Sequence, residues 1–220
     1  MLEERAHKQI NTAGVAIETI EALKIQNDKS SQQKASNSSE DIDEDWMNQF
    51  VRYAEDASSD RLQQLWGRIL AGESKEPGAF SRQTLRFVAE LDRETAENCE
   101  LMAKYQLHFW ILRSEDWSQG EKYMISIDLQ RLGLIEGIGI GGPEQSFEIA
   151  DNGFTIINGQ KLGLLVKGQP GTKISIPIFV IIRVGLQVFS LLKLMNENES
   201  LREIVQEIKK LISNRLQLGR

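Results

Sequence analysis

The glycine-rich run GIGIGG at residues 137–142 is the segment whose spacing comes closest to a known chemical motif. Its glycines match the pattern G-x-G-x-x-G, in which a tight turn brings backbone N–H groups close to the pyrophosphate of a dinucleotide. That chemistry needs a preceding strand and a following helix, whereas Pro143 and a strand-like stretch follow here. The pattern therefore predicts a flexible hairpin turn in preference to a dinucleotide site.

Thiol and metal chemistry need clusters of cysteine, histidine or acidic residues, and the sequence offers isolated candidates. Cys99, the single cysteine, falls in a helical pattern among apolar neighbours and is predicted to be a buried thiol. His7 and His108 are the two histidines, and neither has a partner motif. The acidic run DIDED at 41–45 lacks the central glycine of a calcium loop and instead favours a helix start. We therefore predict no catalytic residue, metal site or cofactor, and keep an enzyme with an unrecognised site as an alternative.

Recognition of nucleic acid is a further chemistry that the residue pattern suggests. The stretch IDLQRLGLIEG at 127–137 is typical of the junction between a helix and the wing of a winged-helix domain, where the helix can lie in a DNA major groove. Its candidate contacts to phosphate are Arg131, Lys161 and Lys173. The net charge of −6 and the scarcity of basic residues on the helix argue against such binding. A DNA-binding regulator is therefore retained as an alternative only.

Composition places the chain among globular proteins with a hydrophobic core. Of its 220 residues, 40% are apolar and 26% are charged, which allows one or two domains. The apolar stretch 174–192 contains Pro177 and Arg183, so we predict a strand over 174–181 and a helix over 183–195 in place of a membrane span. The start MLEERAHKQI has neither the basic nor the apolar region of a signal peptide, and a cytoplasmic, bacterial-type location is expected.

The first 40 residues separate into a helix and a polar segment. Apolar residues at helical spacing predict a helix over 3–25. Residues 26–40 contain no large apolar side chain and are predicted to be a flexible linker. The helix would then be tethered and not obviously packed, a form suited to binding a protein partner or to self-association. Its apolar side comprises Ile10, Ala13, Ile17 and Ile20, with Ala6 and Leu23 at the margins.

Residues 58–91 read as a helical hairpin, the core of the predicted fold. Apolar residues at spacings i, i+3, i+4, i+7 and i+8 predict the first helix. We expect Gly72 to end it, Pro77-Gly78 to turn the chain and a second helix to follow. The cap candidates are Ser58, Ser59 or Asp60 for the first helix and Ser81 for the second, and the first apolar face comprises Leu62, Leu65, Trp66, Ile69 and Leu70.

The remaining elements complete an α+β fold that is mostly helical. A helix carrying Trp46 and Phe50 precedes the hairpin, and helices over about 93–107, capped by Asp92, and about 125–132 follow it. Turn signals within 134–181 indicate three or four short antiparallel strands, a winged-helix-like element, before helices at about 183–195 and 200–214. The predicted organisation is a tethered helix at 1–25, a linker at 26–40 and one globular domain at 41–220, helical over 41–132, β-rich over 133–181 and helical over 182–214.

Three short motifs follow one another in the first half of the chain: EDW at 44–46, LWGRILAGE at 65–73 and PGAFSRQTL at 77–85. Their order resembles the signature of an uncharacterised bacterial family, domain of unknown function 2806, and the resemblance covers most of residues 40–195. Because that family has no known activity, the resemblance implies a structural role for the motifs. The signature residues are Trp46, Leu65, Trp66, Arg68, Leu70, Gly72, Pro77, Gly78, Phe80 and Ser81.

A more distant layout is similar to the abortive-infection alpha proteins of bacterial phage defence. It comprises the helical hairpin, a turn at Leu132–Ile135 and a late glycine-containing helix at Val184–Phe189. Together these features favour a non-enzymatic bacterial interaction protein, with phage defence as the implied setting. Its expected partner is a protein or a second copy of the chain, bound through the first helix, and neither nucleic acid nor a membrane.

Overall fold

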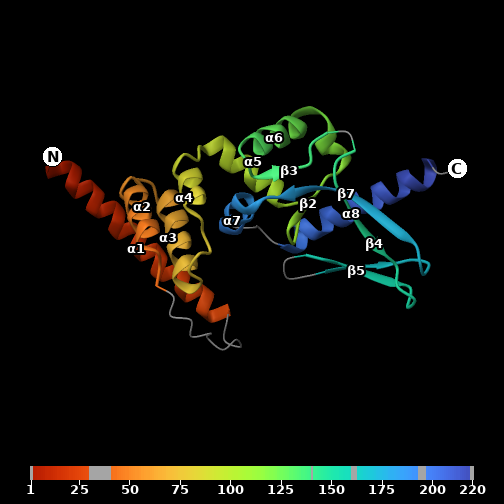
Figure 1. Cartoon of the computed structure of the whole chain (residues 1–220), viewed down its shortest axis with the longest axis horizontal. Helices are drawn as coiled ribbons and strands as arrows, with labels where there is room; N and C mark the ends of the chain where they lie inside the picture. Colours follow the sequence, from red (N-terminus) through yellow and green to blue (C-terminus); the bar gives the residue numbers. More distant parts are fainter. Residues whose placement is uncertain (1, 30–40, 140, 160–162, 193–196, 219–220) are drawn as a thin grey trace. The chain divides into compact units, whose positions relative to one another are not determined.

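The computed structural model describes residues 2–29, 41–139, 141–159, 163–192 and 197–218 (Figure 1). Within it the chain divides into two compact units, Met1–Leu91 and Asp92–Arg220. The sequence predicted a division at a linker over 26–40, but the first helix continues to Lys29. Residues 30–40 of that predicted linker lie outside the described residues. The observed boundary separates a helical unit from an α+β unit, because the first helix packs on the predicted hairpin.

The described part of the first unit consists of helices, and side chains cap three of their starts. Each capping side chain accepts a hydrogen bond from a backbone N–H that has no partner within its own helix. The caps are Asp43 for α2, Ser59 for α3 and Ser81 for α4, the last as predicted. The helices are α1 (Leu2–Lys29), α2 (Glu44–Glu55), α3 (Asp60–Lys75) and α4 (Arg82–Ala89).

Aromatic side chains join α2 to α3. The Trp46 ring stacks on Phe50 with their centroids 5.3 Å apart, and Phe50 meets the edge of Trp66 at 5.6 Å. Tyr53 stacks on Trp66 from another side at 5.7 Å. Trp66 is 2% exposed and Ile69 is fully buried, which confirms the predicted core face. Leu62 and Leu65, at the margin of that face, are half-buried.

Helix α1 is packed and not merely tethered, which corrects the sequence prediction. Its Val15 and Thr19 are buried, and α1 packs mainly on α3. A Cβ atom on Gly67 of α3 would lie 2.6 Å from Cβ of Glu18, so only glycine permits this approach. Gly14 of α1 faces Gln63 of α3 just as closely. The packed face of α1 therefore uses small and polar residues, which an apolar pattern does not reveal.

Gly72 does not end its helix as predicted. The helix α3 continues through Gly72 to Lys75, and a Cβ at position 72 would lie 2.6 Å from Cε2 of Phe80. This glycine therefore makes room for an aromatic ring and does not supply a left-handed turn. The left-handed residue is Gly78, with φ of +87°, in the predicted Pro77-Gly78 turn.

The second unit combines helices with antiparallel strands, which confirms the predicted α+β class. Asp92 caps α5 as predicted, but α5 ends at Ala103 because Gln106–Leu107 enters a short hairpin. His108 turns this hairpin with φ of 55°. The elements are α5 (Arg93–Ala103), β1 (Gln106–Leu107), β2 (Trp110–Leu112), η1 (Glu115–Ser118), α6 (Gly120–Arg131), β3 (Ile135–Glu136), β4 (Glu144–Glu148), β5 (Phe154–Asn158), β6 (Gly163–Lys167), β7 (Lys173–Ile181), α7 (Arg183–Leu191) and α8 (Glu197–Leu218).

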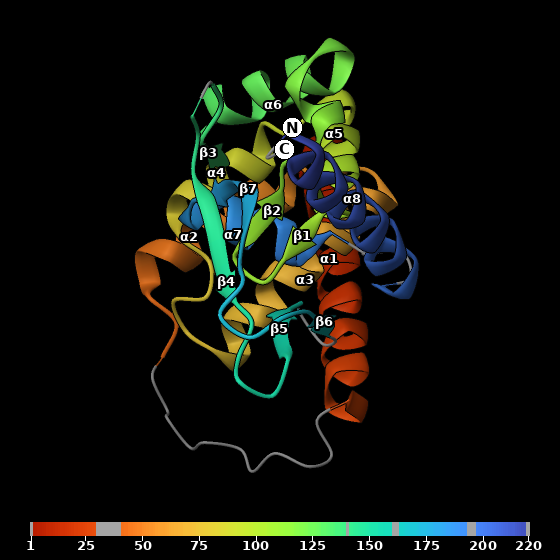
Figure 2. The ribbon, with the colours of Figure 1, turned by 90° about the vertical axis from the view of Figure 1, so that its right-hand side faces the viewer.

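Strand β7 organises the described sheet of the second unit. It pairs with β2, with β3 and, along its first half, with β4, so the order is β1-β2-β7-β3 with β4 also on β7. Figure 2 shows β4 running beside β7. The strands β5 and β6 form a separate hairpin inserted between β4 and β7. Between α6 and α7 the structure has five described strands, more than the three or four expected, and their likeness to a winged helix stays a prediction.

Helices that precede the sheet in the chain and helices that follow it both pack in this unit. Helix α5 contacts α6 and α7, while α6 contacts β3 and α8 contacts β7. Phe179 of β7, 1% exposed, meets the Trp117 ring edge-on at 6.3 Å. Among the described residues, no helix has both the length and the apolar character that crossing a membrane requires.

We predict that Cys99 is inert in the folded chain. Its side chain is fully buried in α5, and this burial raises the pKa of the thiol to about 12. At about pH 8 only about one molecule in 10⁴ would carry the reactive thiolate, against roughly a quarter for a free cysteine. A thiol-reactive chromophore should therefore label the native chain very slowly and the guanidinium-unfolded chain at once. Fast labelling of the native chain at the unfolded rate would show that this part of α5 opens freely.

Candidate functional site

The signature residues gather around the end of α3 and the loop that follows it. The Glu73 side chain, 2% exposed, accepts hydrogen bonds from the backbone N–H of Gly78 at 2.6 Å and of Phe80 at 2.8 Å. Trp46 Nε1 donates to the carbonyl of Phe80 at 2.7 Å. One carboxylate and one indole thus hold the loop between α3 and α4 in place. We name this arrangement the loop clamp, comprising Glu73, Trp46 and the loop residues 76–81.

The other signature residues surround the loop clamp. Gly72 accommodates the Phe80 ring, Ser81 caps α4, and Pro77 is half-buried in the loop. Of the residues on α3, Trp66 is buried, and Leu65, Arg68 and Leu70 are half-buried. Glu73 lies within the quoted motif, but no sequence pattern singles it out, because a glutamate in a helix is usually exposed. The arrangement accounts for the signature by packing and hydrogen bonding.

The residues considered for contact with nucleic acid do not form a bare cationic surface. Arg131, near the end of α6, lies 3.4 Å from the carboxylate of Asp128. Lys173, at the start of β7, lies 4.0 Å from the carboxylate of Glu148. Lys161 lies outside the described residues. Each described candidate therefore has a neighbouring negative charge that reduces its attraction for phosphate.

Helix α1 exposes an apolar face, which we name the α1 stripe: Ile10, Ala13, Ile17 and Ile20. The three isoleucines are 66%, 59% and 54% exposed, and Ala13 is exposed as well. Their spacing of three, four and three residues is that of the a and d positions of a coiled coil. The sequence correctly placed these residues on one side of a helix, but that side faces solvent and the opposite side packs on α3.

Two polar contacts fix the side of α1 that faces outward. Asn11 donates from Nδ2 to the carbonyl of Glu55 at 2.8 Å, and Lys8 Nζ lies 3.2 Å from the Glu55 carboxylate. The hydrogen bond with that carboxylate raises the pKa of Lys8. Both contacts attach α1 to the end of α2. Rotating α1 to bury its isoleucines would break both of these contacts. It would also bring larger side chains of α1 against Gly67, where the two helices come closest.

The described residues offer no cluster of three or more histidine, cysteine or acidic side chains suited to a metal ion. The candidate site of the first unit is the exposed apolar surface of the α1 stripe. This surface can bind another apolar surface, because the contact buries apolar side chains that are otherwise exposed to water.

Comparison with known proteins identifies a family for this chain. A family model described as "Protein of unknown function (DUF2806)" matches residues 2–119. No curated protein and no solved structure matches the chain significantly. The matched segment includes α1 and the loop clamp and ends before α6, whereas the resemblance drawn from the motifs ran from residue 40 to 195. The α1 stripe thus lies within the matched segment.

We predict that removing the Glu73 carboxylate destabilises the first unit. Glu73→Ala leaves the N–H groups of Gly78 and Phe80 without acceptors, and we expect a loss of about 2–4 kcal/mol in the free energy of unfolding. Glu73→Gln retains one acceptor oxygen and should lose less. Urea unfolding followed by tryptophan fluorescence measures both. Glu76→Ala, which removes an exposed carboxylate three residues on, is the matched control, and equal midpoints for all four chains would contradict the loop clamp.

Proposed function

Since the chain belongs to the DUF2806 family, whose description names no activity, we propose its function from the surface that its first unit exposes. The chain is a non-enzymatic interaction protein that associates with a second copy of itself through the α1 stripe. The observation that carries this proposal is the exposure of Ile10, Ile17 and Ile20 at coiled-coil spacing on a helix whose other side is already packed. The proposal places this association in a bacterial cytoplasm.

The sequence of the α1 stripe is self-complementary when one helix is reversed. An antiparallel pair centred on Val15 places Ile10 opposite Ile20 and Ala13 opposite Ile17. A two-fold axis then repeats each contact, as in the isologous interfaces of most homodimers. The small Ala13 and its exposed neighbour Ala16 allow the two helices to approach closely.

The expected affinity is modest. Each isoleucine still exposes more than half of its surface, so its burial contributes roughly 1–1.5 kcal/mol. Six isoleucines in a dimer then contribute roughly 6–9 kcal/mol, against an association cost of roughly 4–15 kcal/mol. The largest gain less the smallest cost leaves roughly 5 kcal/mol, so we expect a reversible dimer with a dissociation constant of roughly 0.2 mM or weaker. Binding of DNA is not proposed, because Arg131 and Lys173 lie beside carboxylates.

We predict that Ile17→Glu abolishes self-association, because it places two like charges in the centre of the antiparallel interface. Sedimentation equilibrium over a range of concentrations should give a monomer–dimer equilibrium for the wild-type chain and a monomer for the variant. The thermal unfolding temperature should stay unchanged, since Ile17 does not contact α3 as a core residue. Gln64→Glu adds the same charge to an exposed position of α3 and should still dimerise. A wild-type chain that remains monomeric throughout, or a variant that dimerises as well, would contradict the proposal.

Phage defence is the cellular setting that we propose for this association, and the resemblance to abortive-infection alpha proteins supports it. We predict that host cells expressing the wild-type chain lower the plating efficiency of a phage panel, and that Ile17→Glu restores plating. Immunoblots should give equal amounts of the two chains. Plating that is the same with and without the wild-type chain would remove the defence setting and leave self-association to its own test.

A further inference from the structure

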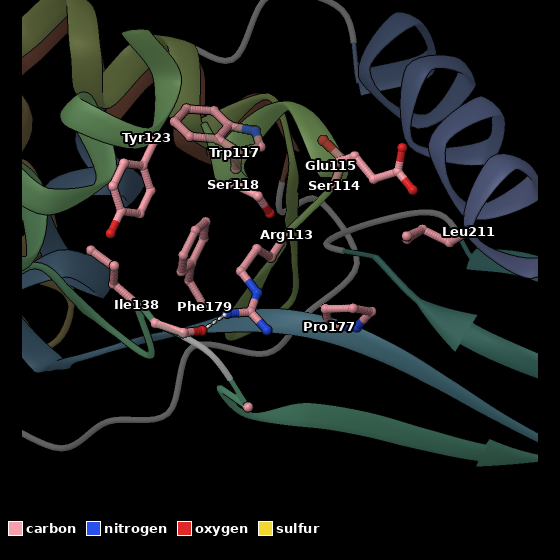
Figure 3. A pocket seen from close by; sticks show the side chains of 12 residues that line it. Arg113, Ser114, Glu115, Trp117, Ser118, Tyr123, Ile138, Pro177, Phe179 and Leu211 are labelled. Carbon is pink, nitrogen blue, oxygen red and sulfur yellow. Dashed lines mark hydrogen bonds between the residues drawn. The ribbon is translucent and has the colours of Figure 1, made fainter. Parts of the chain in front are cut away.

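The second unit contains a pocket with features that point to a ligand (Figure 3). Its volume is about 350 Å³, within the range of pockets that hold small organic molecules. The segment from β2 to η1 forms one wall and β7 forms another, while the glycine-rich loop after β3 closes a third side. Among its lining side chains, those with apolar surface are Trp117, Tyr123, Ile138, Pro177, Phe179 and Leu211.

Arg113 brings a positive charge into this pocket. Its Nη1 donates to the carbonyl oxygens of Gly139 at 2.9 Å and Gly137 at 3.2 Å. A Cβ on Gly142 would lie 2.6 Å from Nη1, so a glycine there leaves room for the guanidinium. Among the described residues, the Arg113 side chain makes no ion pair and no hydrogen bond beyond these two. The loop therefore holds one nitrogen of the guanidinium and leaves the Nε–Nη2 edge for an acceptor.

Two polar side chains of the pocket are buried without a partner. Ser114 and Trp117 are each 1% exposed, and within the described part of the chain Ser114 Oγ and Trp117 Nε1 make no hydrogen bond. Buried polar groups in folded proteins nearly always have a partner, because leaving one unpaired costs free energy. Both atoms can donate hydrogen bonds, as the free edge of the guanidinium can. The lining of the pocket thus includes three hydrogen-bond donors without an acceptor among the described residues, namely Ser114 Oγ, Trp117 Nε1 and the Nε–Nη2 edge of Arg113. A ligand with acceptor atoms could pair with them.

The charges and walls narrow the class of ligand. Arg113 is the cation among the lining residues, and Glu115 is an anion on the same rim. Figure 3 shows Glu115 pointing toward Leu211, while Phe179, Tyr123 and Trp117 gather on the other side of Arg113. A single cation compensates a monoanion but leaves a dianionic phosphate ester undercompensated next to Glu115. The aromatic and aliphatic side chains of the walls can pack against an aromatic or aliphatic part of the ligand.

We propose that this pocket binds a small organic carboxylate with an aromatic or branched aliphatic body. The carboxylate accepts hydrogen bonds from the free edge of Arg113 and from Ser114, a geometry that suits the planar fork of the guanidinium. The body lies against Phe179, Pro177 and Ile138. This site is separate from the α1 stripe, because all of its residues belong to the second unit.

Titration of the ¹⁵N-labelled full chain with benzoate, phenylacetate and 4-methylvalerate tests the proposal. We expect at least one of these carboxylates to shift the Trp117 indole resonance saturably at concentrations up to about 10 mM. Phenylacetamide, the neutral counterpart of phenylacetate, should bind about tenfold more weakly or worse. The absence of a saturable shift with all three carboxylates, or equal binding of the amide, would overturn the proposal. Tighter binding of phenyl phosphate than of phenylacetate would overturn the assignment to carboxylates.

Two variants identify the residues responsible. Arg113→Gln should weaken binding of the best carboxylate about tenfold or more, whereas Arg202→Gln, at an exposed arginine of the same unit, should leave it unchanged. Ser114→Ala is a second variant in case Arg113→Gln fails to fold, and it should weaken binding about threefold to tenfold. Unaltered affinity in a folded Arg113→Gln or Ser114→Ala chain would overturn the assigned contacts. Ile17→Glu should bind as the wild type does, so failure of self-association and failure of this site are distinguishable.

Discussion

The crossing of α1 over α3 at Gly14 and Gly67 determines what the first unit can offer to other molecules. A Cβ atom at Gly67 would clash with the backbone of Glu18 and Thr19, so the two helices meet nearly backbone to backbone there, while Gly14 lies against the end of the Gln63 side chain. Close approach fixes the rotation of α1 and directs Val15 and Thr19 inward. The isoleucines of the α1 stripe are then left on the opposite side. The exposed apolar surface is thus a consequence of the crossing and not a failure of the unit to bury a core.

The loop clamp solves a second problem in the same unit. The loop between α3 and α4 must turn within a few residues, and the backbone N–H groups of Gly78 and Phe80 point toward α3. Glu73 satisfies both of them, and Trp46 donates to a loop carbonyl while stacking on Phe50. A buried carboxylate is costly unless it is fully hydrogen-bonded, so its burial and the shape of the loop depend on each other. This mutual dependence explains why the motifs around 46, 73 and 80 occur together.

Sequence patterns predicted the features that depend on local chemistry. Ser81 and Asp92 were identified as caps because capping needs one side chain and the N–H three residues on. The patterns failed where a contact with a residue distant in sequence determines the local structure. Gly72 looked like a helix end, but its role is set by Phe80, and His108 turns a hairpin that no turn motif announces. The loop clamp and the Arg113 pocket join residues separated along the chain, so no spacing within one segment could reveal them.

The GIGIGG run illustrates how a motif can be read correctly as a turn and still contribute to a site. It does not open a helix, so it cannot present N–H groups to a pyrophosphate in the manner of a dinucleotide fold. The carbonyl oxygens of Gly137 and Gly139 instead accept hydrogen bonds from Arg113. The loop therefore contributes acceptors that orient a cation, and the cation in turn can hold an anion.

The extent of the family match divides the pocket into two parts. Its donors Arg113, Ser114 and Trp117 lie within residues 2–119, which the family model covers, whereas Ile138 and the β7 residues Pro177 and Phe179 lie beyond it. Recognition of a charged group depends on the first part, because only there are donors and positive charge combined. The size and shape of the ligand body depend on the second part, which forms the apolar wall. In this chain the choice among carboxylates therefore lies with β7 and the glycine-rich loop, and the preference for an anion lies with the segment between β2 and η1.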